Sequence, residues 1–551
     1  MAQAGDKLAT ALERLHALQL EGRRVFRAAE FSRTTRDRLI AAGYLLSPIR
    51  GWLVASSPVA LLPGESTPWY TSFWEFCAAY SHARFGQDWH LSAEQSLLLL
   101  TENWTIPRQV VVCSPSASNN SVELPFDTSL FDLRLARRDP TIGIPVSGTG
   151  SDRSSAGVPA PELRILSAEV AIIRVPESFF RRNPAEAAAV LSGMRDVTPL
   201  TRALLIGAHT AVAGRLIGAL RHLARADDAD AVGSAMRSAM HDVRESDPFE
   251  ESQIGGATAV PGQNDMHGQR LFARHGTTST SALALRIRAL WTATRDDVAA
   301  RFRLPAAVTA TPAGRGDLDL VTRAIDERYA SDAYHSLSIE GYHVTAGLIE
   351  RVRTGRWSPD AEDRGQRDAL AAHGYWLAFQ SVKTSILRAL DGRPVAQVVR
   401  TDHRDWYRSL FSPAVSAGIV SPGALAGYRN SPVFIRSSRH VPPRAGAVPD
   451  AMDALFECIA DESHAGVAAV LAHWLFGYIH PYPDGNGRMA RFLMNALLVS
   501  GGFDWTVIQI ADRPEYMAAL DRASVEQRLD HFTDLVVRCM ARPAAGVAIE
   551  S

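Results

Sequence analysis

The chain has 551 residues, of which 46% are hydrophobic and 21% are charged, and its formal net charge is -1. This length predicts about three or four folded domains, and the composition excludes a largely disordered chain. The near-zero charge excludes a global field that would attract nucleic acid or a membrane, so any such partner needs a local patch.

The cysteines and the N-terminus indicate the compartment. Four cysteines lie far apart, with no CxxC pair and no metal-ligand spacing, which is typical of a reduced, cytosolic protein. The N-terminus lacks a basic segment followed by an apolar run, and no stretch of about 18 apolar residues could span a bilayer. We therefore expect a cytoplasmic protein with no membrane partner.

Residues 1–60 predict a winged helix-turn-helix. Leucines recur at helical spacing, two short helical segments follow, and "GYLLSPIRGWLV" predicts a small β-hairpin. Arg33, Arg36 and Arg38 lie on the second helix of the pair, where a recognition helix would meet the major groove of operator DNA. Winged helices also dock proteins, and a small helical domain with a solvated basic face has the same pattern. DNA binding and protein docking both stay open.

Residues 61–248 predict an α+β region. "SFWEFCAAYSHARF" and "TRALLIGAHTAVAGRLIGALRHLAR" are helical, whereas "RQVVVCS", "LFDLRLAR" and "VAIIRVP" have the composition of strands. The first 250 residues or so resemble the antitoxin component of abortive-infection (AbiEi-type) systems, in the order of their elements and in Gly43, Gly51 and Gly214. That resemblance implies operator binding or restraint of a toxin.

Residues 249–283 predict a linker, because they are rich in Gly, Ser, Thr and Gln and lack periodicity. Residues 284–551 then predict a second folded region that is almost entirely helical. The fold class that we expect is therefore mainly α, with an α+β middle region.

A glycine-containing loop interrupts this helical region in "IHPYPDGNGRMARF", residues 479–492. The loop lies between two apolar helices and leads into the N-terminus of the second, where unpaired N–H groups favour an anion. Gly485 and Gly487 let the backbone approach a phosphate closely. Arg488 and Arg491 lie three residues apart on one face and suit further phosphate oxygens.

Two further side chains complete the constellation. Asp484, at the entrance of the loop, can hold a divalent cation that bridges phosphate oxygens. His480 lies four residues before it and can take a proton from an incoming hydroxyl. A packed histidine, an ordinary turn or a solvated pair of arginines would each be common alone, but their combination at a helix N-terminus favours phosphate chemistry.

The segment from His480 to Arg491 resembles the signature HPFx[D/E]GNGRxxR of the Fic (filamentation induced by cAMP) family. Every chemical position is present, and only the apolar Phe of the signature is replaced, by Tyr482. The buried hydroxyl of Tyr482 must find a partner or shift the loop. The related Doc kinases carry Lys and Ala where this loop has Asn486 and Gly487, which argues against their inverted nucleotide orientation.

The resemblance implies an all-helical core and an adenylyltransferase that moves AMP from ATP to a protein hydroxyl. It implies His480 as the base, Asp484 on Mg²⁺, and the loop amides with Asn486 on the α- and β-phosphates. Arg488 and Arg491 would bind the β- and γ-phosphates.

A second stretch, "HSLSIEGYH", resembles the inhibitory pattern [S/T]xxxE[G/N] of the same family. Ser336 and Glu340 lie four residues apart and Gly341 follows, so the inhibitory helix is expected near residues 332–343. By analogy Glu340 would bind Arg491 and occupy the place of the γ-phosphate. An ordinary helical glutamate near a capping serine is the alternative.

The resemblance also implies a flap and a nucleotide-base helix. "NSPVFIRSSRHVPP", residues 430–443, matches the flap, a β-hairpin edge that takes a target segment as an added strand. Tyr516 is a candidate for contact with adenine, although a core tyrosine is more common.

Three functions remain compatible with the sequence. The leading one is Mg²⁺-dependent transfer of AMP to Ser, Thr or Tyr, inhibited by Glu340. The second is removal of AMP from a modified target by the same site, with Glu340 orienting water. The third is a DNA-binding regulator in which an antitoxin-like half restrains its own Fic toxin.

Overall fold

The computed structural model describes residues 2–20, 22–58, 66–136, 139–146, 162–250, 281–303, 318–357 and 366–542. The chain divides into an N-terminal unit, Met1–Gln263 with Ser431–Arg444, and a C-terminal unit, Asn264–Asn430 with Ala445–Ser551. Among the described residues, no helix combines the length and the apolar character that crossing a membrane requires.

The N-terminal unit begins with a small helical module that carries a three-stranded sheet. Its elements are α1 (Ala2–Gln19), β1 (Val25–Arg27), the short 3-10 helix η1 (Ala28–Glu30), α2 (Arg33–Ala41), β2 (Leu45–Leu46) and β3 (Trp52–Ala55). Both β1 and β2 pair antiparallel with β3. Ser32 begins α2, because its side chain accepts a hydrogen bond from the Thr35 N–H. The middle helix of the predicted motif is a single 3-10 turn, and the winged helix-turn-helix stays a prediction.

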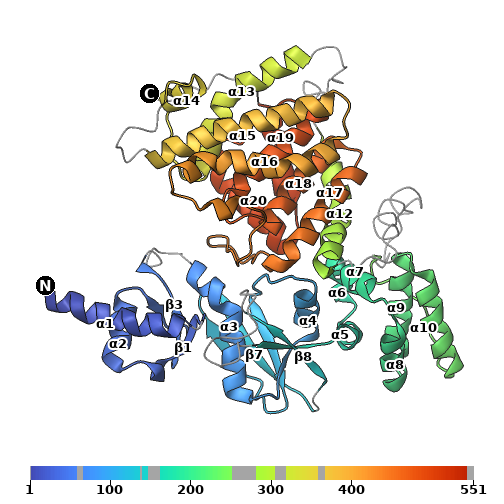
Figure 1. Cartoon of the computed structure of the whole chain (residues 1–551). Helices are drawn as coiled ribbons and strands as arrows, with labels where there is room; N and C mark the ends of the chain where they lie inside the picture. The colour runs from blue at the N-terminus through green and yellow to red at the C-terminus, as the bar shows by residue number, and fades with distance from the viewer. Residues whose placement is uncertain are drawn as a thin grey trace. The chain divides into compact units, whose positions relative to one another are not determined.

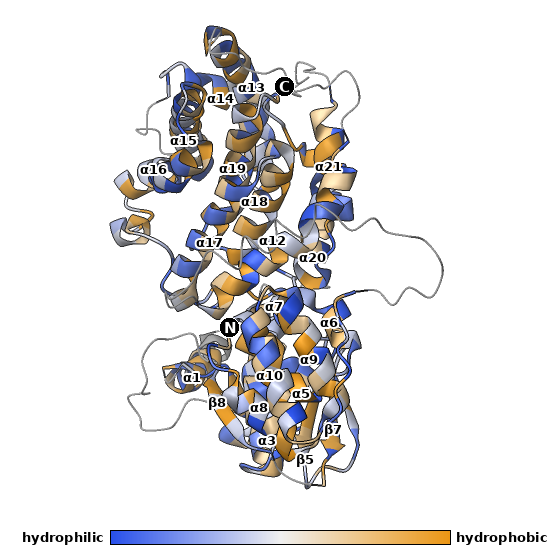
Figure 2. Cartoon of the chain, turned by 90° about the vertical axis from the view of Figure 1, so that its right-hand side faces the viewer, coloured by the Kyte–Doolittle hydropathy of each residue, from blue (hydrophilic) through white to orange (hydrophobic). Residues whose placement is uncertain are grey.

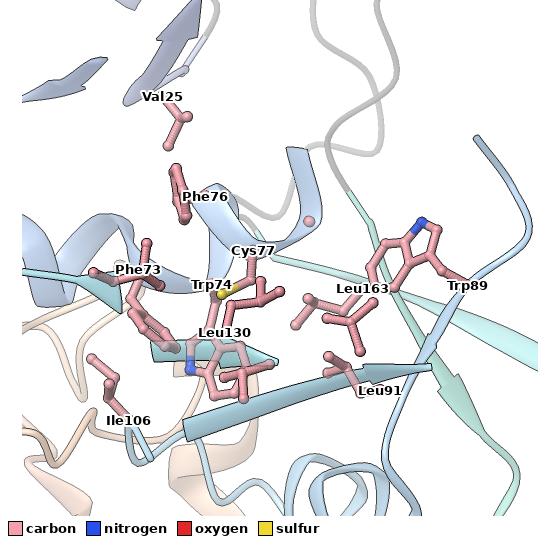
Figure 3. Packing of buried hydrophobic residues seen from close by; sticks show 14 of the residues in the cluster. Val25, Phe73, Trp74, Phe76, Cys77, Trp89, Leu91, Ile106, Leu130 and Leu163 are labelled. Carbon is pink, nitrogen blue, oxygen red and sulfur yellow. The ribbon is translucent and has the colours of Figure 1, made fainter. Parts of the chain in front are cut away.

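An α+β region follows, as the composition predicts. Its elements are α3 (Thr67–Phe85), β4 (His90–Leu91), α4 (Ala93–Leu100), β5 (Gln109–Ser114), β6 (Ser121–Leu124), β7 (Thr128–Arg134), β8 (Thr141–Pro145) and β9 (Glu162–Leu166). One sheet has the order β4-β5-β7-β6, with β5 parallel to β7, and β8 pairs with β9. Aromatic residues of α3 such as Phe73 and Trp74 pack with Leu91 and Leu130 in one core (Figure 3).

The strand predicted at "VAIIRVP" is wrong. Most of this segment belongs to α5 (Ala168–Arg174), and the neighbouring strand is β9. The Ser167 side chain accepts a hydrogen bond from the Val170 N–H and so begins a helix there. Ile172 and Ile173 are buried in this helix. A short buried helix and a buried strand have the same run of apolar residues in the sequence, so the pattern does not distinguish them.

The remaining helices of the N-terminal unit pack closely. They are α6 (Ser178–Arg182), α7 (Pro184–Gly193), α8 (Thr198–Ile206), α9 (Thr210–His222) and α10 (Ala226–Ser238). A Cβ added at Gly214 would collide with the Arg244 carbonyl oxygen, and one at Gly218 with that of Ser246. The glycines of α9 therefore permit the backbone of residues 244–246 to pass close to this helix. Most of the predicted 249–283 linker lies outside the described residues.

The described residues of the C-terminal unit form helices joined by loops, with no strand among them (Figure 1). Its α-helices are α12 (Ala282–Arg301), α13 (Leu318–Ile339), α14 (Ala346–Arg353), α15 (Gln366–Leu390), α16 (Val395–Ser416), α17 (Val448–Asp461), α18 (Ala465–Ile479), α19 (Asn486–Ser500), α20 (Arg513–Glu526) and α21 (Asp530–Met540). Short 3-10 helices lie at Pro422–Leu425, Ala445–Ala447 and Ile510–Asp512. Hydrophobic and hydrophilic residues share the same helices in Figure 2, so the helices pack through apolar faces.

Helices α18 and α19 form the centre of this packing. Nearly every residue of both helices is buried, and the two helices contact each other along their length. The glycine loop that joins them is therefore fixed at both ends by core helices.

The β-hairpin predicted at residues 430–443 is not formed. No strand is assigned between Ser431 and Arg444, all of which are described, and the segment turns at Arg436 and Ser437. Pro432, Pro442 and Pro443 lack the N–H groups that a strand ladder needs. The segment also belongs to the N-terminal unit rather than to the helical unit that contains its neighbours in sequence.

Candidate active site

The site is built on the loop between α18 and α19. His480 ends α18 in the left-handed conformation, with φ 52° and ψ 59°, and Gly485 precedes α19 with φ 77°. A Cβ added at Gly485 would lie 2.8 Å from Phe411 Cε2. The glycine is therefore required both by its backbone angle and by the phenyl ring beside it. The first N–H groups of α19 remain available for an anion.

The Asn486 side chain points into the loop and stabilises it. Its Oδ1 accepts a hydrogen bond from the Tyr482 N–H at 2.9 Å, and its Nδ2 donates to the Tyr482 carbonyl oxygen at 2.8 Å. The side chain is only 2% exposed. The phosphate contact expected of Asn486 stays a prediction for its backbone N–H, since its side chain is already satisfied by the loop.

His480 is held as a neutral base. Its Nδ1 lies 3.1 Å from the Gly477 carbonyl oxygen, so Nδ1 carries the hydrogen and Nε2 keeps a free lone pair. Burial lowers the pKa of His480 to about 4, and the charge of Arg429 adds to this. The imidazole is therefore ready to accept a proton at neutral pH.

Arg429 fixes the backbone beside this histidine. Its Nε donates to the His480 carbonyl oxygen at 2.8 Å, and its backbone N–H donates to the Pro481 carbonyl oxygen at 2.9 Å. The sequence pattern gave no signal for this contact, because the two segments are far apart in the chain.

Asp484 is the exposed acid of the loop. One carboxylate oxygen accepts from the Gly485 N–H at 2.6 Å, and the other lies 3.7 Å from Arg488 Nη2. The side chain is 67% exposed. This exposed carboxylate can therefore bind a cation. Asp484 is the one acidic residue of the loop between α18 and α19.

Arg488 is a buried cation between two aromatic rings. Its guanidinium carbon lies 5.3 Å from the centre of the Tyr342 ring and 5.1 Å from that of Phe411. Its Nε has no hydrogen-bond partner among the described residues, and the side chain is 2% exposed. A buried donor of this kind indicates a missing acceptor, such as a phosphate oxygen.

Arg491 is bound by the segment that the sequence predicts to be inhibitory. Its Nε donates to Ser336 Oγ at 2.9 Å, and its Nη2 donates to Glu340 Oε1 at 2.8 Å. Partial desolvation raises the pKa of Glu340, but the charges of Arg491 and Arg488 outweigh this and leave the pKa below its ordinary value. The carboxylate is therefore ionised and paired.

Glu340 lies over the N-terminus of α19. A Cβ added at Gly487 would collide with Glu340 Oε1, so the carboxylate occupies the space above the first turn of the helix. An anionic group already lies where a phosphate would bind. Gly341, with φ 84°, lets the chain turn away directly after α13.

Several residues outside the motifs hold α13 in place. Tyr375 donates to the buried carboxylate of Asp332 at 2.6 Å, and Arg513 Nε donates to the Ile339 carbonyl oxygen at 2.8 Å. Burial raises the pKa of Asp332 to about 6. No local pattern identifies these residues, because each contact joins segments that are distant in sequence.

The two tyrosines singled out from the sequence are both buried. The Tyr516 hydroxyl lies 3.4 Å from Arg491 Nη1 and 3.0 Å from His473 Nε2. Tyr516 therefore lies in the core and does not line an open pocket for the adenine base. Tyr482 stacks on Tyr407 at 3.7 Å between ring centres. Its hydroxyl has no hydrogen-bond partner in the described part of the chain.

The arginines of the predicted recognition helix are partly neutralised. Arg36 Nη2 lies 2.8 Å and Arg33 Nε 3.8 Å from the Asp37 carboxylate, while Arg38 Nη1 donates to the Lys7 carbonyl oxygen at 3.1 Å. Asp37 offsets part of the charge of Arg33 and Arg36, whereas the bond to a backbone carbonyl leaves the charge of Arg38 unchanged. DNA binding by residues 1–60 stays a prediction.

Comparison with known proteins finds similarity in the helical unit. Residues 400–498 match the model of the Fic/DOC family. The chain is 28% identical over 224 residues to a protein adenylyltransferase Fic of Nematostella vectensis, covering 40% of this chain and 49% of that protein. It is 28% identical over 221 residues to the Drosophila grimshawi protein of the same name, covering 39% and 42%. The chain thus spans half or less of these curated relatives.

Among solved structures, the chain is similar to a fragment of Fic-1 from C. elegans, with 17% identity and a TM-score of 0.34, covering 66% of this chain and 96% of that one. It is also similar to a Fic domain containing signaling protein from Bacteroides thetaiotaomicron, with 20% identity and a TM-score of 0.34, covering 45% and 92%.

Proposed function

We propose that this chain, which carries a Fic domain that includes residues 400–498, is a protein adenylyltransferase that transfers AMP from ATP to a protein hydroxyl. The observation that carries the proposal is the buried pair Arg488 and Arg491 beside the N-terminus of α19, over which the Glu340 carboxylate already lies. Two buried cations and a row of N–H groups suit a triphosphate better than a single phosphate. The name of the curated relatives agrees with this activity.

In the proposed reaction His480 Nε2 takes the proton of the acceptor hydroxyl. The hydroxyl oxygen attacks the α-phosphorus of ATP, the bond from that phosphorus to the bridging oxygen breaks, and pyrophosphate leaves. The N–H groups of α19 and the two arginines stabilise the charge that develops on the phosphate oxygens. The neutral state of His480, which follows from its pKa of about 4, keeps the base competent at neutral pH.

Asp484 would hold Mg²⁺. A single exposed carboxylate fits this ion, which keeps several waters and takes its other ligands from substrate phosphates. Bound there, Mg²⁺ would neutralise phosphate charge and orient the pyrophosphate leaving group.

Glu340 restrains the site in this proposal. It pairs with Arg491 and lies over Gly487, so the γ-phosphate of ATP and the carboxylate compete for one position. ATP bound in the presence of Glu340 would have to shift, and its α-phosphate would leave the line of attack.

The test distinguishes a role of His480 as the catalytic base from a role in binding ATP. In a Glu340→Ala background, His480→Ala should lower AMP incorporation by roughly 10²- to 10⁴-fold, as loss of a general base does. The affinity for ATP, measured by calorimetry, should stay nearly unchanged. His473→Ala is unsuitable as a control because His473 contacts Tyr516. The control is therefore the partly exposed His241 of the N-terminal unit. Loss of ATP affinity together with transfer would assign His480 a structural role and remove the proposed base.

A further inference from the structure

A column of aromatic rings in the helical unit holds Arg488 between two of its members. Tyr482 stacks on Tyr407 with 3.7 Å between the ring centres, and the Tyr407 ring lies 5.0 Å from the Phe411 ring. The guanidinium carbon of Arg488 lies 5.1 Å from the centre of the Phe411 ring and 5.3 Å from that of the Tyr342 ring. We call Tyr342, Tyr407, Phe411 and Tyr482 the aromatic column. All four lie in the C-terminal unit.

Helix α16 and the glycine loop fix the Phe411 ring. Tyr407 and Phe411 lie four residues apart on α16, which places their side chains on one face of the helix. Both side chains are buried, and Tyr482, which stacks on Tyr407, is only 1% exposed. The Phe411 ring also lies against the glycine loop, since a Cβ added at Gly485 would come within 2.8 Å of it. The ring that faces Arg488 from α16 is therefore packed on two sides.

The turn at the end of α13 fixes the Tyr342 ring. The Gly341 N–H donates to the Ser338 carbonyl oxygen at 3.0 Å, and the Tyr342 N–H donates to the Leu337 carbonyl oxygen at 3.1 Å. With Gly341 at φ 84°, these two hydrogen bonds form the Schellman motif that ends many helices. Tyr342 is half-buried, and its position follows from the turn that directly follows Glu340.

Arg488 lacks the polar partners that a buried arginine usually has. Its side chain is 2% exposed, and its Nε has no hydrogen-bond partner among the described residues. Asp484 lies 3.7 Å from Arg488 Nη2, beyond hydrogen-bond distance, and at 67% exposure its charge is screened by water. The Glu340 carboxylate also attracts Arg488, but its hydrogen bond goes to Arg491. A buried charge without a close partner is costly, so other contacts must offset this cost.

The two rings offset the cost and leave the N–H donors unused. An aromatic face attracts a guanidinium group through the electrostatic field of the ring when the group lies within about 6 Å of the ring centre. A carboxylate, by contrast, binds the N–H groups themselves, as Glu340 does with Arg491. The N–H groups of Arg488 therefore stay available to an anion that enters the site.

We propose that Tyr342 and Phe411 are positioning residues, which hold the Arg488 guanidinium in place with its N–H groups free for the phosphates of ATP. The role rests on the proposed function, in which Arg488 binds a phosphate of this nucleotide. Tyr342 and Glu340, two residues apart, then have opposite effects. The ring prepares Arg488 for a phosphate, whereas the carboxylate occupies Arg491.

The test measures ATP affinity by calorimetry, in the presence of Mg²⁺, on the full chain in a Glu340→Ala background. Tyr342→Leu and Phe411→Leu each remove a ring, whereas Tyr342→Phe keeps the ring and loses only the hydroxyl. Tyr334→Leu is the matched control, because Tyr334 is a half-buried tyrosine of α13 outside the column. Each ring variant is also combined with Arg488→Gln, and the midpoint of thermal unfolding is measured for every variant.

Tyr342→Leu and Phe411→Leu should weaken ATP binding about three- to tenfold, whereas Tyr342→Phe and Tyr334→Leu should match the parent. In the Arg488→Gln background, the loss of either ring should have little further effect, because the rings act through Arg488. The half-buried Tyr342 ring can be removed with little change in the unfolding midpoint, and Phe411→Leu is the independent second variant. Unchanged affinity in Tyr342→Leu, or an equal loss with and without Arg488, would overturn the proposal.

The outcome for the proposed function is distinguishable, because binding and transfer are measured separately. A parent that binds ATP but incorporates no label from α-labelled ATP would refute the transferase assignment. The comparison of affinities would still decide the role of the two rings. A parent that binds no ATP would overturn both claims.

Discussion

Replacing Glu340 by alanine should release the transferase. Glu340 Oε1 lies 2.8 Å from Arg491 Nη2, and the side chains are 29% and 3% exposed. A hydrogen bond between charged groups contributes about 1.5–3 kcal/mol, and the exposure of Glu340 favours the lower end. About 1.5 kcal/mol corresponds to roughly a tenfold change in an equilibrium.

The carboxylate also fills space above Gly487, so its removal opens room for a phosphate. We therefore expect AMP incorporation to rise at least about tenfold in Glu340→Ala. The assay is incorporation of label from α-labelled ATP at a concentration below the KM.

Glu327→Ala is the matched control, because Glu327 is an exposed carboxylate on α13, the helix that ends directly before Glu340. It should leave incorporation unchanged. Equal incorporation by wild type and Glu340→Ala, with ATP bound in both, would refute the inhibitory role of Glu340. A rise in the Glu327→Ala control would instead indicate a general loosening of α13.

Three further outcomes follow from the loop. Tyr482→Phe removes a buried hydroxyl that has no hydrogen-bond partner among the described residues. The free energy of unfolding should therefore rise by about 1–2 kcal/mol. Calorimetry should then show a higher midpoint, and a lower one would reveal a partner for the hydroxyl. Gly485→Ala should lower the midpoint, because φ is 77° and the new Cβ would lie 2.8 Å from Phe411, a strain of about 1–3 kcal/mol. In the control Gly427→Ala, the new Cβ meets no atom within 4 Å, so the midpoint of unfolding should stay unchanged. Finally, burial lowers the pKa of His480 from 6.5 to about 4. Protonation of the base should therefore not reduce the transfer rate of Glu340→Ala between about pH 7 and 5. A decline centred near pH 6.5 would contradict a histidine that stays neutral in this range.

The sequence predicts those parts of the site that depend on residues lying a few positions apart in the chain. Helix periodicity places the glycine loop between two core helices, and the positions of Ser336 and Glu340 predict the segment that binds Arg491. The inward orientation of Asn486 needs the three-dimensional path of the loop, which brings its amide back to Tyr482.

The parts that the sequence does not predict depend on distant contacts. The helix at Ala168–Arg174 has the apolar residues of a strand, and only the cap at Ser167 distinguishes the two. The predicted hairpin at residues 430–443 is absent, and Arg444 at the end of this stretch instead binds Glu102, which lies 342 residues away in the chain. Residue spacing carries no signal for such a contact.

The central claim is that the α-phosphate of ATP, and not the γ-phosphate, is transferred to protein. The most direct measurement incubates Glu340→Ala with Mg²⁺ and ATP labelled at the α-phosphate or, in parallel, at the γ-phosphate, with the double variant Glu340→Ala/His480→Ala as the blank. We expect protein-bound label from α-labelled ATP alone, and none in the blank. Protein-bound label from γ-labelled ATP would show a phosphotransferase with the opposite nucleotide orientation and would contradict the account.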